Sequence, residues 1–398
     1  MKLHLFNPQN DLALADGNAN YCAPPSASKI AYDLASLPLW FADSDDSVLL
    51  PDNIHIEYYN TYSNIINIPK VFNSNVNDIA KCVPWGWSAQ IKKKLKTMGF
   101  EESQLMSDTT IEELRQLSNR KTSIKILQIL GKEGVDIPQL PQYITKLDKV
   151  GEYVCSMPLS VIKAPWSGSG KGIAWGLGRK EIPVEHFAKG IIRKQGGIIC
   201  EKFLNKIVDF AMEFYFTDGK IFFKGYSLFN SVKGVYSGNI LASDNVIENF
   251  LSEYIPKTEF DDLKEILIST LENLFCDFKY TGYLGIDMMI YLDENNIYKL
   301  NPCVELNLRM NMGAASRILY DKYVCENKTG IYKVDYFKQQ GKALEEHNIN
   351  TKKYPLILNN GKIESGYLSL SPVTERTQYM AYIIIDKNQK SLSSLYNR

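Results

Sequence analysis

The chain has 398 residues, 45% of them hydrophobic, so it can bury a substantial core, and its length predicts two or three structural units. The 45 basic and 45 acidic residues give a formal net charge of zero. This balance excludes an overall field that would attract nucleic acid or an anionic membrane. A small-molecule substrate is the expected partner.

The seven cysteines are scattered, with no C-x-x-C pair and an odd total. This pattern argues against a disulfide framework or a structural zinc site and favours a reducing compartment. The N-terminus becomes polar before an apolar core of signal-peptide length forms, and no later stretch reaches transmembrane length. A cytoplasmic location without a membrane partner is therefore expected; the sequence does not indicate an oligomeric state.

Residues 1–105 are expected to form an N-terminal α/β domain. It opens with an apolar strand, Lys2 to Phe6, which is followed by the turn-prone segment Asn7 to Asp11. Further strands are expected over Ser47 to Leu50 and His55 to Tyr59. A helix over Ala89 to Met98, capped by Ser88 and ended by Gly99, completes the domain.

A second unit, residues 106–326, begins with helical patterns at residues 110–115 and 123–130, the latter closed by Gly131 or Gly134 and by Pro138. A lid subdomain is expected over about residues 159–216. Its strands are expected at 160–164, 197–203 and 210–216, with a helix at 185–195. A helix at 261–276 and a hairpin of strands 284–291 and 297–300 follow.

Residues 327–398 form a C-terminal, β-containing extension. It carries a Lys-rich helix and a hairpin of strands Tyr354 to Leu358 and Lys362 to Leu370 about the Asn360-Gly361 turn. A last strand is expected over residues 379–385. The fold class is therefore a combination of α/β and α+β units.

A glycine-rich loop at residues 167–172 follows a buried strand that carries Lys163. Glycines let backbone N–H groups approach phosphate oxygens, and a lysine adds positive charge. The Walker A pattern is excluded, because Gly172 stands where that motif needs Ser or Thr. An ordinary surface turn is the alternative for the loop, and a strand-edge lysine that reaches solvent is the alternative for Lys163. The loop residues are Ser167, Gly168, Ser169, Gly170, Lys171 and Gly172.

From about residue 115 to 315, the order of motifs resembles the ATP-grasp superfamily, which includes biotin carboxylase and D-alanine–D-alanine ligase. Lys121, ahead of the Gly134-Val-Asp-Ile-Pro138 turn, and Lys163, on the strand before the glycine loop, match two family lysines. The resemblance implies that both contact the phosphates of ATP and that the glycine loop covers them. It also implies the ATP-grasp fold, preceded by a pre-ATP-grasp domain.

The hinge strand of the family resembles residues 198–204. By this match Glu201, Lys202 and Leu204 are the residues that recognise adenine. Asp209 stands near the place of the carboxylate that holds the ribose hydroxyls, although the family spacing is often one residue shorter. Strand alternation puts Asp209 and Glu213 on one face, so either can serve. Two solvent-facing acids on an exposed strand are the alternative.

The metal end of the match is irregular. Asp287 resembles the first Mg²⁺ carboxylate, and Asn301 belongs to Lys299-Leu-Asn-Pro302, which resembles the Glu-x-Asn-Pro-Arg strand of the family. Lys299 then stands where the second carboxylate is expected, and Cys303 where the arginine is expected. Two nearby residues can repair the site: Glu305 as the carboxylate and Arg309 as the cation. A single-carboxylate site or an idle nucleotide binder are the other outcomes.

Alternation over residues 304–313 predicts an extended segment with polar residues on one face, which would line the site. The alternative is an amphipathic edge strand whose polar face meets water. The resemblance implies an ATP- and Mg²⁺-dependent ligase that joins a small-molecule carboxylate to an amine through an acylphosphate. Arg309 is the candidate for holding the acceptor or the acylphosphate, and Lys163 for stabilising the transferred phosphoryl group. A regulatory ATP-binding protein, a small-molecule kinase and an interaction protein without a nucleotide site are the alternatives.

Overall fold

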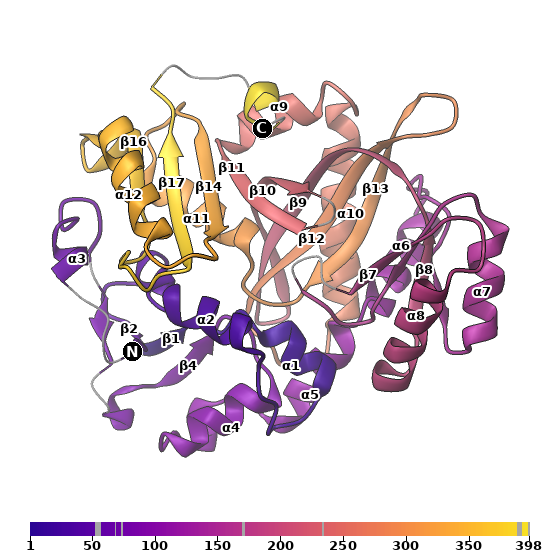
Figure 1. The fold of residues 1–398 in the computed structure, drawn as a ribbon, viewed down its shortest axis with the longest axis horizontal. Helices are drawn as coiled ribbons and strands as arrows, with labels where there is room; N and C mark the ends of the chain where they lie inside the picture. The colour runs from indigo at the N-terminus through magenta and orange to yellow at the C-terminus, as the bar shows by residue number, and fades with distance from the viewer. Residues whose placement is uncertain are drawn as a thin grey trace.

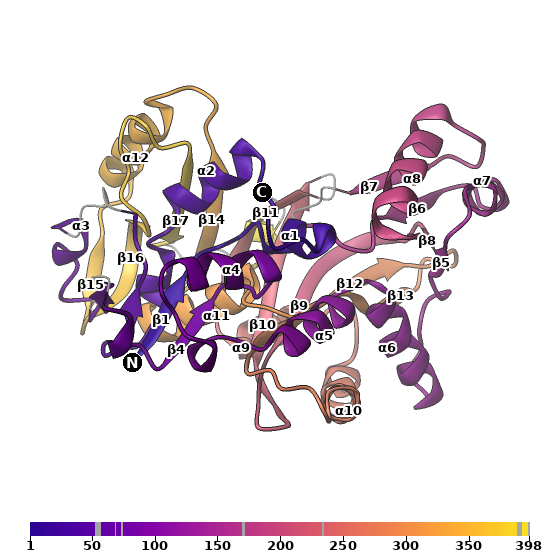
Figure 2. The same ribbon diagram turned by 90° about the horizontal axis from the view of Figure 1, so that it is seen from below.

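Three β-sheets organise the chain in this computed structural model (Figure 1). The structure describes residues 1–51, 57–67, 69–72, 75–168, 172–232, 235–387 and 392–396. The first sheet belongs to the N-terminal domain, the second to a lid, and the third runs through the centre of the molecule. Figure 2 shows the lid helices α7 (Leu147–Ser156) and α8 (Ile182–Gln195) at one end of the molecule and the N-terminal domain beside the central sheet.

The N-terminal domain is built on a four-stranded parallel sheet of order β3-β2-β1-β4. The expected first strand and the helix capped by Ser88 are confirmed: Ser88 Oγ accepts a hydrogen bond from Ile91 N at 3.4 Å. The expected strand from His55 to Tyr59 is wrong from Glu57 onward, where a short helix begins, and its first two residues lie outside the described part of the chain. The elements are β1 (Lys2–Leu5), α1 (Asn10–Asp16), α2 (Pro25–Asp33), η1 (Leu37–Trp40), β2 (Ser47–Val48), α3 (Glu57–Asn60), β3 (Lys70–Val71), η2 (Val76–Asp78), β4 (Lys81–Pro84), α4 (Ala89–Thr97) and η3 (Glu102–Gln104).

The lid is a four-stranded antiparallel sheet of order β5-β8-β6-β7 with α7 and α8 packed on it. Its strands are β5 (Gln142–Ile144), β6 (Ser160–Lys163), β7 (Ile173–Gly176) and β8 (Ile198–Lys202). The lid therefore begins before residue 159. It ends before residue 216, because the strand expected over 210–216 belongs to the central sheet.

The central sheet has nine strands in the order β13-β12-β9-β10-β11-β14-β17-β16-β15. Its last four strands come from the C-terminal segment, so the extension continues this sheet. The expected hairpin is confirmed, with φ of 49° at Asn360 and 76° at Gly361, as a tight type I′ turn requires. The strands are β9 (Asn205–Thr217), β10 (Lys220–Val232), β11 (Val235–Leu241), β12 (Gly282–Leu292), β13 (Tyr298–Asn307), β14 (Gly330–Tyr336), β15 (Ile357–Asn359), β16 (Lys362–Ser369) and β17 (Tyr379–Ile385).

Alternation along β9 and β12 separates an apolar face from a mixed face. Phe210, Phe214, Leu284 and Ile286 are fully buried in the largest core cluster, together with apolar residues of the helix spanning residues 257–274. The other face of these strands carries the acidic residues and is turned toward α1 and the lid. The remaining helices are α5 (Asp108–Leu117), α6 (Lys121–Lys132), α9 (Asp244–Leu251), α10 (Lys257–Leu274), α11 (Met312–Tyr323), α12 (Lys342–Lys353) and α13 (Leu392–Tyr396).

Candidate active site

Acidic side chains meet on the mixed face of β9, β12 and β13. Asp287 lies opposite Ala211 of β9 on one side and Glu305 of β13 on the other. Glu213 of β9 lies opposite Gly285 of β12. Because alternate residues of a strand share a face, Asp209, Glu213, Asp287 and Glu305 all project from the mixed face.

Asp287 and Glu305 form the most highly charged part of this face. Burial raises the pKa of Asp287 well above its ordinary value, and the nearby charges of Glu305 and Glu213 raise it further. A cation between the two carboxylates would relieve this penalty. Their oxygens are the hard donors that Mg²⁺ prefers, so the donor set fits that ion. Within the described residues, no group of three or more His, Cys, Asp or Glu side chains is placed to hold a metal.

The carboxylate of β13 that lies opposite Asp287 is Glu305, six residues beyond Lys299. Lys299 lies opposite Tyr291 and forms an ion pair with Asp136 at 2.7 Å, away from Asp287. Asn301 lies opposite Met289, and its Oδ1 accepts a hydrogen bond from Cys303 N at 3.2 Å. The register shifts between these pairs and the Asp287–Glu305 pair.

The sequence contains a signal that Glu305 is the residue that aligns with the glutamate of the family strand. Glu305, Asn307 and Arg309 keep the Glu-x-Asn-x-Arg spacing of the expected strand, six residues beyond the frame set by Asn301 and Pro302. The match to Asn-Pro points to the frame of Asn301, whereas the cross-strand pairing of Asp287 with Glu305 favours the later frame. Asn307 lies opposite Gly285, on the same face as Glu305, and it hydrogen-bonds the Asp287 carboxylate.

The extended segment expected over residues 304–313 ends early. β13 stops at Asn307, and Asn311 caps α11 by accepting a hydrogen bond from Ala314 N at 2.9 Å. Arg309 therefore lies in the connection between the strand and the helix. The alternative of a solvent-exposed edge strand is also wrong for Asn311, which is buried.

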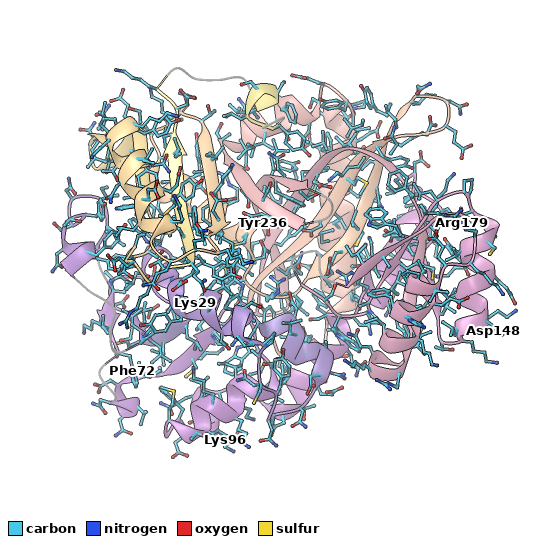
Figure 3. All side chains as sticks on the ribbon, viewed as in Figure 1. Lys29, Phe72, Lys96, Asp148, Arg179 and Tyr236 are labelled. Carbon is cyan, nitrogen blue, oxygen red and sulfur yellow. The ribbon has the colours of Figure 1, made fainter. Side chains whose placement is uncertain are left out.

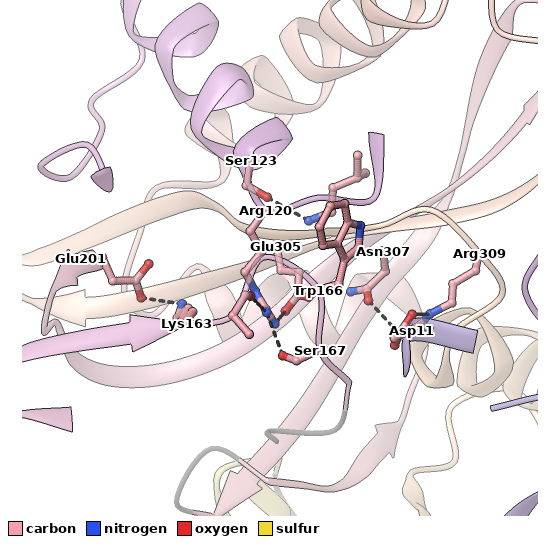
Figure 4. A network of polar contacts seen from close by, with 12 residues as sticks. Asp11, Arg120, Ser123, Lys163, Trp166, Ser167, Glu201, Glu305, Asn307 and Arg309 are labelled. Atoms are coloured by element: carbon pink, nitrogen blue, oxygen red, sulfur yellow. Dashed lines mark hydrogen bonds and ion pairs between the residues drawn. The ribbon is translucent and has the colours of Figure 1, made fainter. Parts of the chain in front are cut away.

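Arg309 is held by Asp11 of α1. Its Nε and Nη2 donate to the two oxygens of Asp11, both at 2.7 Å, and Nη2 also donates to Asn307 Oδ1 at 3.1 Å (Figure 4). A Cβ placed on Gly168 would lie 2.8 Å from Asp11 Oδ2, so the start of the glycine loop lies against the same carboxylate. The N-terminal domain, the loop and the β13–α11 connection thus meet at Arg309.

Lys163 lies buried on β6 and forms an ion pair with Glu201 of β8 (Figure 4). The alternative of a strand-edge lysine reaching solvent is wrong. Lys121 begins α6, and its Nζ lies 3.6 Å from the centroid of the Tyr143 ring on β5. Lys202 pairs with Glu294 at 2.5 Å, and Leu204 is half-buried where the chain passes from the lid into β9.

Asp209 and Glu213 are both buried, so the alternative of two solvent-facing acids is wrong. Asp209 forms an ion pair with Lys206 and accepts a hydrogen bond from Ser231 Oγ at 2.5 Å. Glu213 accepts hydrogen bonds from Ser227 Oγ at 2.8 Å and Asn311 Nδ2 at 2.9 Å, and burial raises its pKa to about 7.

Arg120, which the sequence match passed over, connects the lid to the acidic face. Its Nη1 donates to Ala164 O at 2.5 Å and to Ser167 Oγ at 2.8 Å, and its Nη2 donates to Glu305 Oε2 at 2.8 Å (Figure 4). Gly172, with φ of 88°, closes the loop where its carbonyl accepts a hydrogen bond from Ala164 N at 2.8 Å. Ser169, Gly170 and Lys171 lie outside the described residues.

No protein-family model matches the sequence. No curated protein matches it either. Among the described residues, no helix is long and apolar enough to cross a membrane.

Solved structures of low sequence identity share the fold. N5-carboxyaminoimidazole synthetase from Staphylococcus aureus, complexed with ADP, is 14% identical, with a TM-score of 0.52 over 100% of this chain and 96% of that one. Biotin carboxylase from Campylobacter jejuni, in an ATP complex, is 11% identical, with a TM-score of 0.51 over 97% of this chain and 87% of that one. These likenesses show that the chain has the ATP-grasp fold over its whole length.

Proposed function

We propose that this ATP-grasp chain is an Mg-ATP-dependent ligase that joins a small-molecule carboxylate to an amine through an acylphosphate. The observation that carries the proposal is the facing pair Asp287 and Glu305. Arg309, held by Asp11, and the start of the glycine loop meet on the same side of the sheet. The neighbours include a fungal N5-carboxyaminoimidazole synthase in complex with ADP and 5-aminoimidazole ribonucleotide, at 10% identity and a TM-score of 0.50 over 100% of this chain and 99% of that one.

In this proposal ATP lies between the lid and the mixed face of the central sheet. Glu201, Lys202 and Leu204 contact adenine at the passage from β8 to β9. Asp209 holds the ribose. Lys121, Lys163 and the loop from Ser167 to Gly172 surround the phosphates.

Asp287 and Glu305 would hold Mg²⁺, with Asn307 beside them. The ion would neutralise charge on the phosphates when it is bound. Asn301 would supply a further oxygen donor on the same face, beyond the register shift.

The proposed reaction has two steps, a phosphoryl transfer and an acyl transfer. A carboxylate oxygen of the substrate attacks the γ-phosphorus, the bond to the β–γ bridging oxygen breaks, and ADP leaves. The amine nitrogen then attacks the acyl carbon, the C–O bond to phosphate breaks, and the amine releases a proton. Arg309 orients the acylphosphate, Lys163 stabilises charge on the transferred group, and the loop excludes water that would hydrolyse the intermediate.

An idle nucleotide binder is the rival, because Lys299 and Cys303 stand where the family match expects a carboxylate and an arginine. The position of Glu305 opposite Asp287 and the Asp11-held Arg309 support a reactive site instead. A small-molecule kinase differs only in the acceptor, and product analysis separates it from the ligase.

The test incubates the protein with Mg-ATP, pooled small carboxylates and pooled amines or amino acids, and follows ADP, phosphate and new products. The proposal predicts release of ADP and phosphate that requires both a carboxylate and an amine, with an amide as the product. A phosphorylated acceptor without free phosphate would indicate a kinase. ATP binding without any ADP would indicate the binder.

A further inference from the structure

A cavity lies between the N-terminal domain and the central sheet. Its volume is about 720 Å³. One wall comes from β1 and β4, and the other from residues 279–283 together with parts of β9, β10 and α11. This is a volume typical of sites for small molecules.

The cavity is separate from the candidate active site. The segment between β4 and α4 forms the partition: Trp85 O accepts a hydrogen bond from Met310 N at 3.0 Å, and Gly86 O accepts one from Asn7 Nδ2 at 2.7 Å. Asn7 and Met310 are near neighbours of Asp11 and Arg309 in the chain. Of these four residues, Met310 alone lines the cavity.

The charges that line the cavity are mostly positive. Among the described lining residues are five lysines and one acidic residue, Asp43. Lys2 is near Asp43, at 4.0 Å, and Lys322 Nζ donates to Phe41 O at 3.1 Å. In the described part of the chain no carboxylate forms an ion pair with the other three, which are Lys81, Lys224 and Lys279. A cleft lined by one sign of charge concentrates ions of the other sign.

Aromatic rings form much of the remaining lining. The rings of Tyr215 and Tyr283 lie edge to face, with centroids 5.0 Å apart, and Lys224 Nζ lies 6.0 Å from the Tyr215 centroid. Trp85 and Trp87, from the segment between β4 and α4, also line the cavity. Aromatic walls favour a planar ligand, because rings stack on or pack edgewise against one another.

We propose that this cavity is a second ligand site that takes a small aromatic anion. The ring packs against the aromatic wall, and the acidic group is neutralised by the unpaired lysines. This proposal goes beyond the ligase reaction, because the site does not include the residues assigned to ATP or to the metal.

The test measures binding of phenyl phosphate to the full chain by calorimetry, beside inorganic phosphate and benzyl alcohol. We expect phenyl phosphate to bind at least tenfold more tightly than either fragment and equally well when ATP is saturating. The double variant Lys81→Gln/Lys279→Gln should weaken this binding at least tenfold. The matched control Lys189→Gln/Lys338→Gln, at exposed lysines far from the cavity in the chain, should leave it unchanged.

Each other outcome would overturn the proposal. Absence of phenyl phosphate binding removes the site. Equal binding of benzyl alcohol removes the anion requirement, and equal binding of inorganic phosphate removes the ring requirement. Displacement by ATP places the ligand in the nucleotide site. An equal loss in the control variant shows non-specific attraction to surface lysines. Both variants change exposed side chains, and matching thermal unfolding curves will show that the fold is retained.

Discussion

Arg120 and Glu305 form an ion pair of 2.8 Å that joins the start of α6 to β13. The same guanidinium holds the beginning of the glycine loop through Ala164 O and Ser167 Oγ. Lys163 and Arg309 are likewise paired with carboxylates, Glu201 and Asp11. These three cations are therefore paired with carboxylates within the protein, and in the proposed reaction nucleotide phosphates would compete with the carboxylates for them.

Replacement of Arg120 by Met should increase the mobility of the segment from Ala164 to Ser167, where β6 passes into the glycine loop. The variant leaves Ala164 O without its charged donor and Glu305 without its cation, which should lower the free energy of unfolding by about 1–3 kcal/mol. Amide exchange at residues 164–168 should also become faster. Urea unfolding and hydrogen exchange measure the two effects. Arg179→Met is the matched control, since Arg179 lies on the outer part of the lid and pairs only with Glu181 among the described residues (Figure 3). Equal behaviour of the two variants would show that Arg120 does not hold the loop.

Asp11→Asn should slow turnover while ATP binding changes little. The two hydrogen bonds from Asp11 orient Arg309, and a misplaced positioning group costs on the order of 10- to 100-fold in rate. The kcat of ADP formation and the KM for ATP measure the split. Asp16→Asn is the control, because Asp16 is an exposed carboxylate on the same helix. An unchanged kcat in Asp11→Asn would show that Asp11 does not orient Arg309 for the reaction.

Asp287→Asn and Glu305→Gln should each raise the Mg²⁺ concentration needed for half-maximal activity by roughly tenfold or more, because each removes one of two charged oxygen ligands. Lys299→Gln should have no effect, since Lys299 is paired with Asp136. Titration of ADP formation with Mg²⁺ measures these changes. Asn301→Ala tests whether the Asn301 amide also binds the metal. An increase in the required Mg²⁺ concentration as large as that of Glu305→Gln would place the metal farther along β13.

The sequence pattern predicted the elements around the site well where one face is apolar and the other polar. The sequence predicts an anionic partner for Lys163, because it lies in an apolar strand, and in the structure the partner is Glu201. β10 and β11 were not predicted. Their place in the central sheet depends on pairing with β9 and β14, which local periodicity does not express.

The carboxylate that faces Asp287 is harder to predict from the sequence, because a register shift lies between Asn301 and Glu305. A motif match depends on the number of residues between positions. Which carboxylate faces Asp287 depends instead on the pairing of β12 with β13, which residue spacing does not reveal. Arg120 was missed because its partners are 44 and 185 residues away in the chain. Only the fold brings them together.

The contribution of Glu213 to the stability of the protein should fall as pH rises from about 4.5 to 7. His4 and His347, whose pKa values burial lowers, act with the opposite sign near neutral pH. Burial raises the pKa of Glu213 from an ordinary 4.5 to about 7. Between these values the folded state keeps a proton that the unfolded state releases, so rising pH favours unfolding, and the loss is complete above the folded pKa. A shift of this size corresponds to about 3 kcal/mol. Asp287, whose pKa is also raised, contributes with the same sign.

Glu213→Gln should therefore reduce this slope without abolishing it. Gln keeps an oxygen that can accept from Asn311 Nδ2, and its amide can donate to Ser227 Oγ, so the contacts with β10 and α11 are retained. Urea midpoints at pH 5 and pH 8 measure the slope, with Glu259→Gln on the exposed side of α10 as control. The variant should gain stability relative to the unmodified chain at pH 8 and little at pH 5. A slope identical to that of the control would mean that Glu213 stays ionised when buried, and that its hydrogen bonds and the positive charges of Arg309 and Arg317 offset its burial.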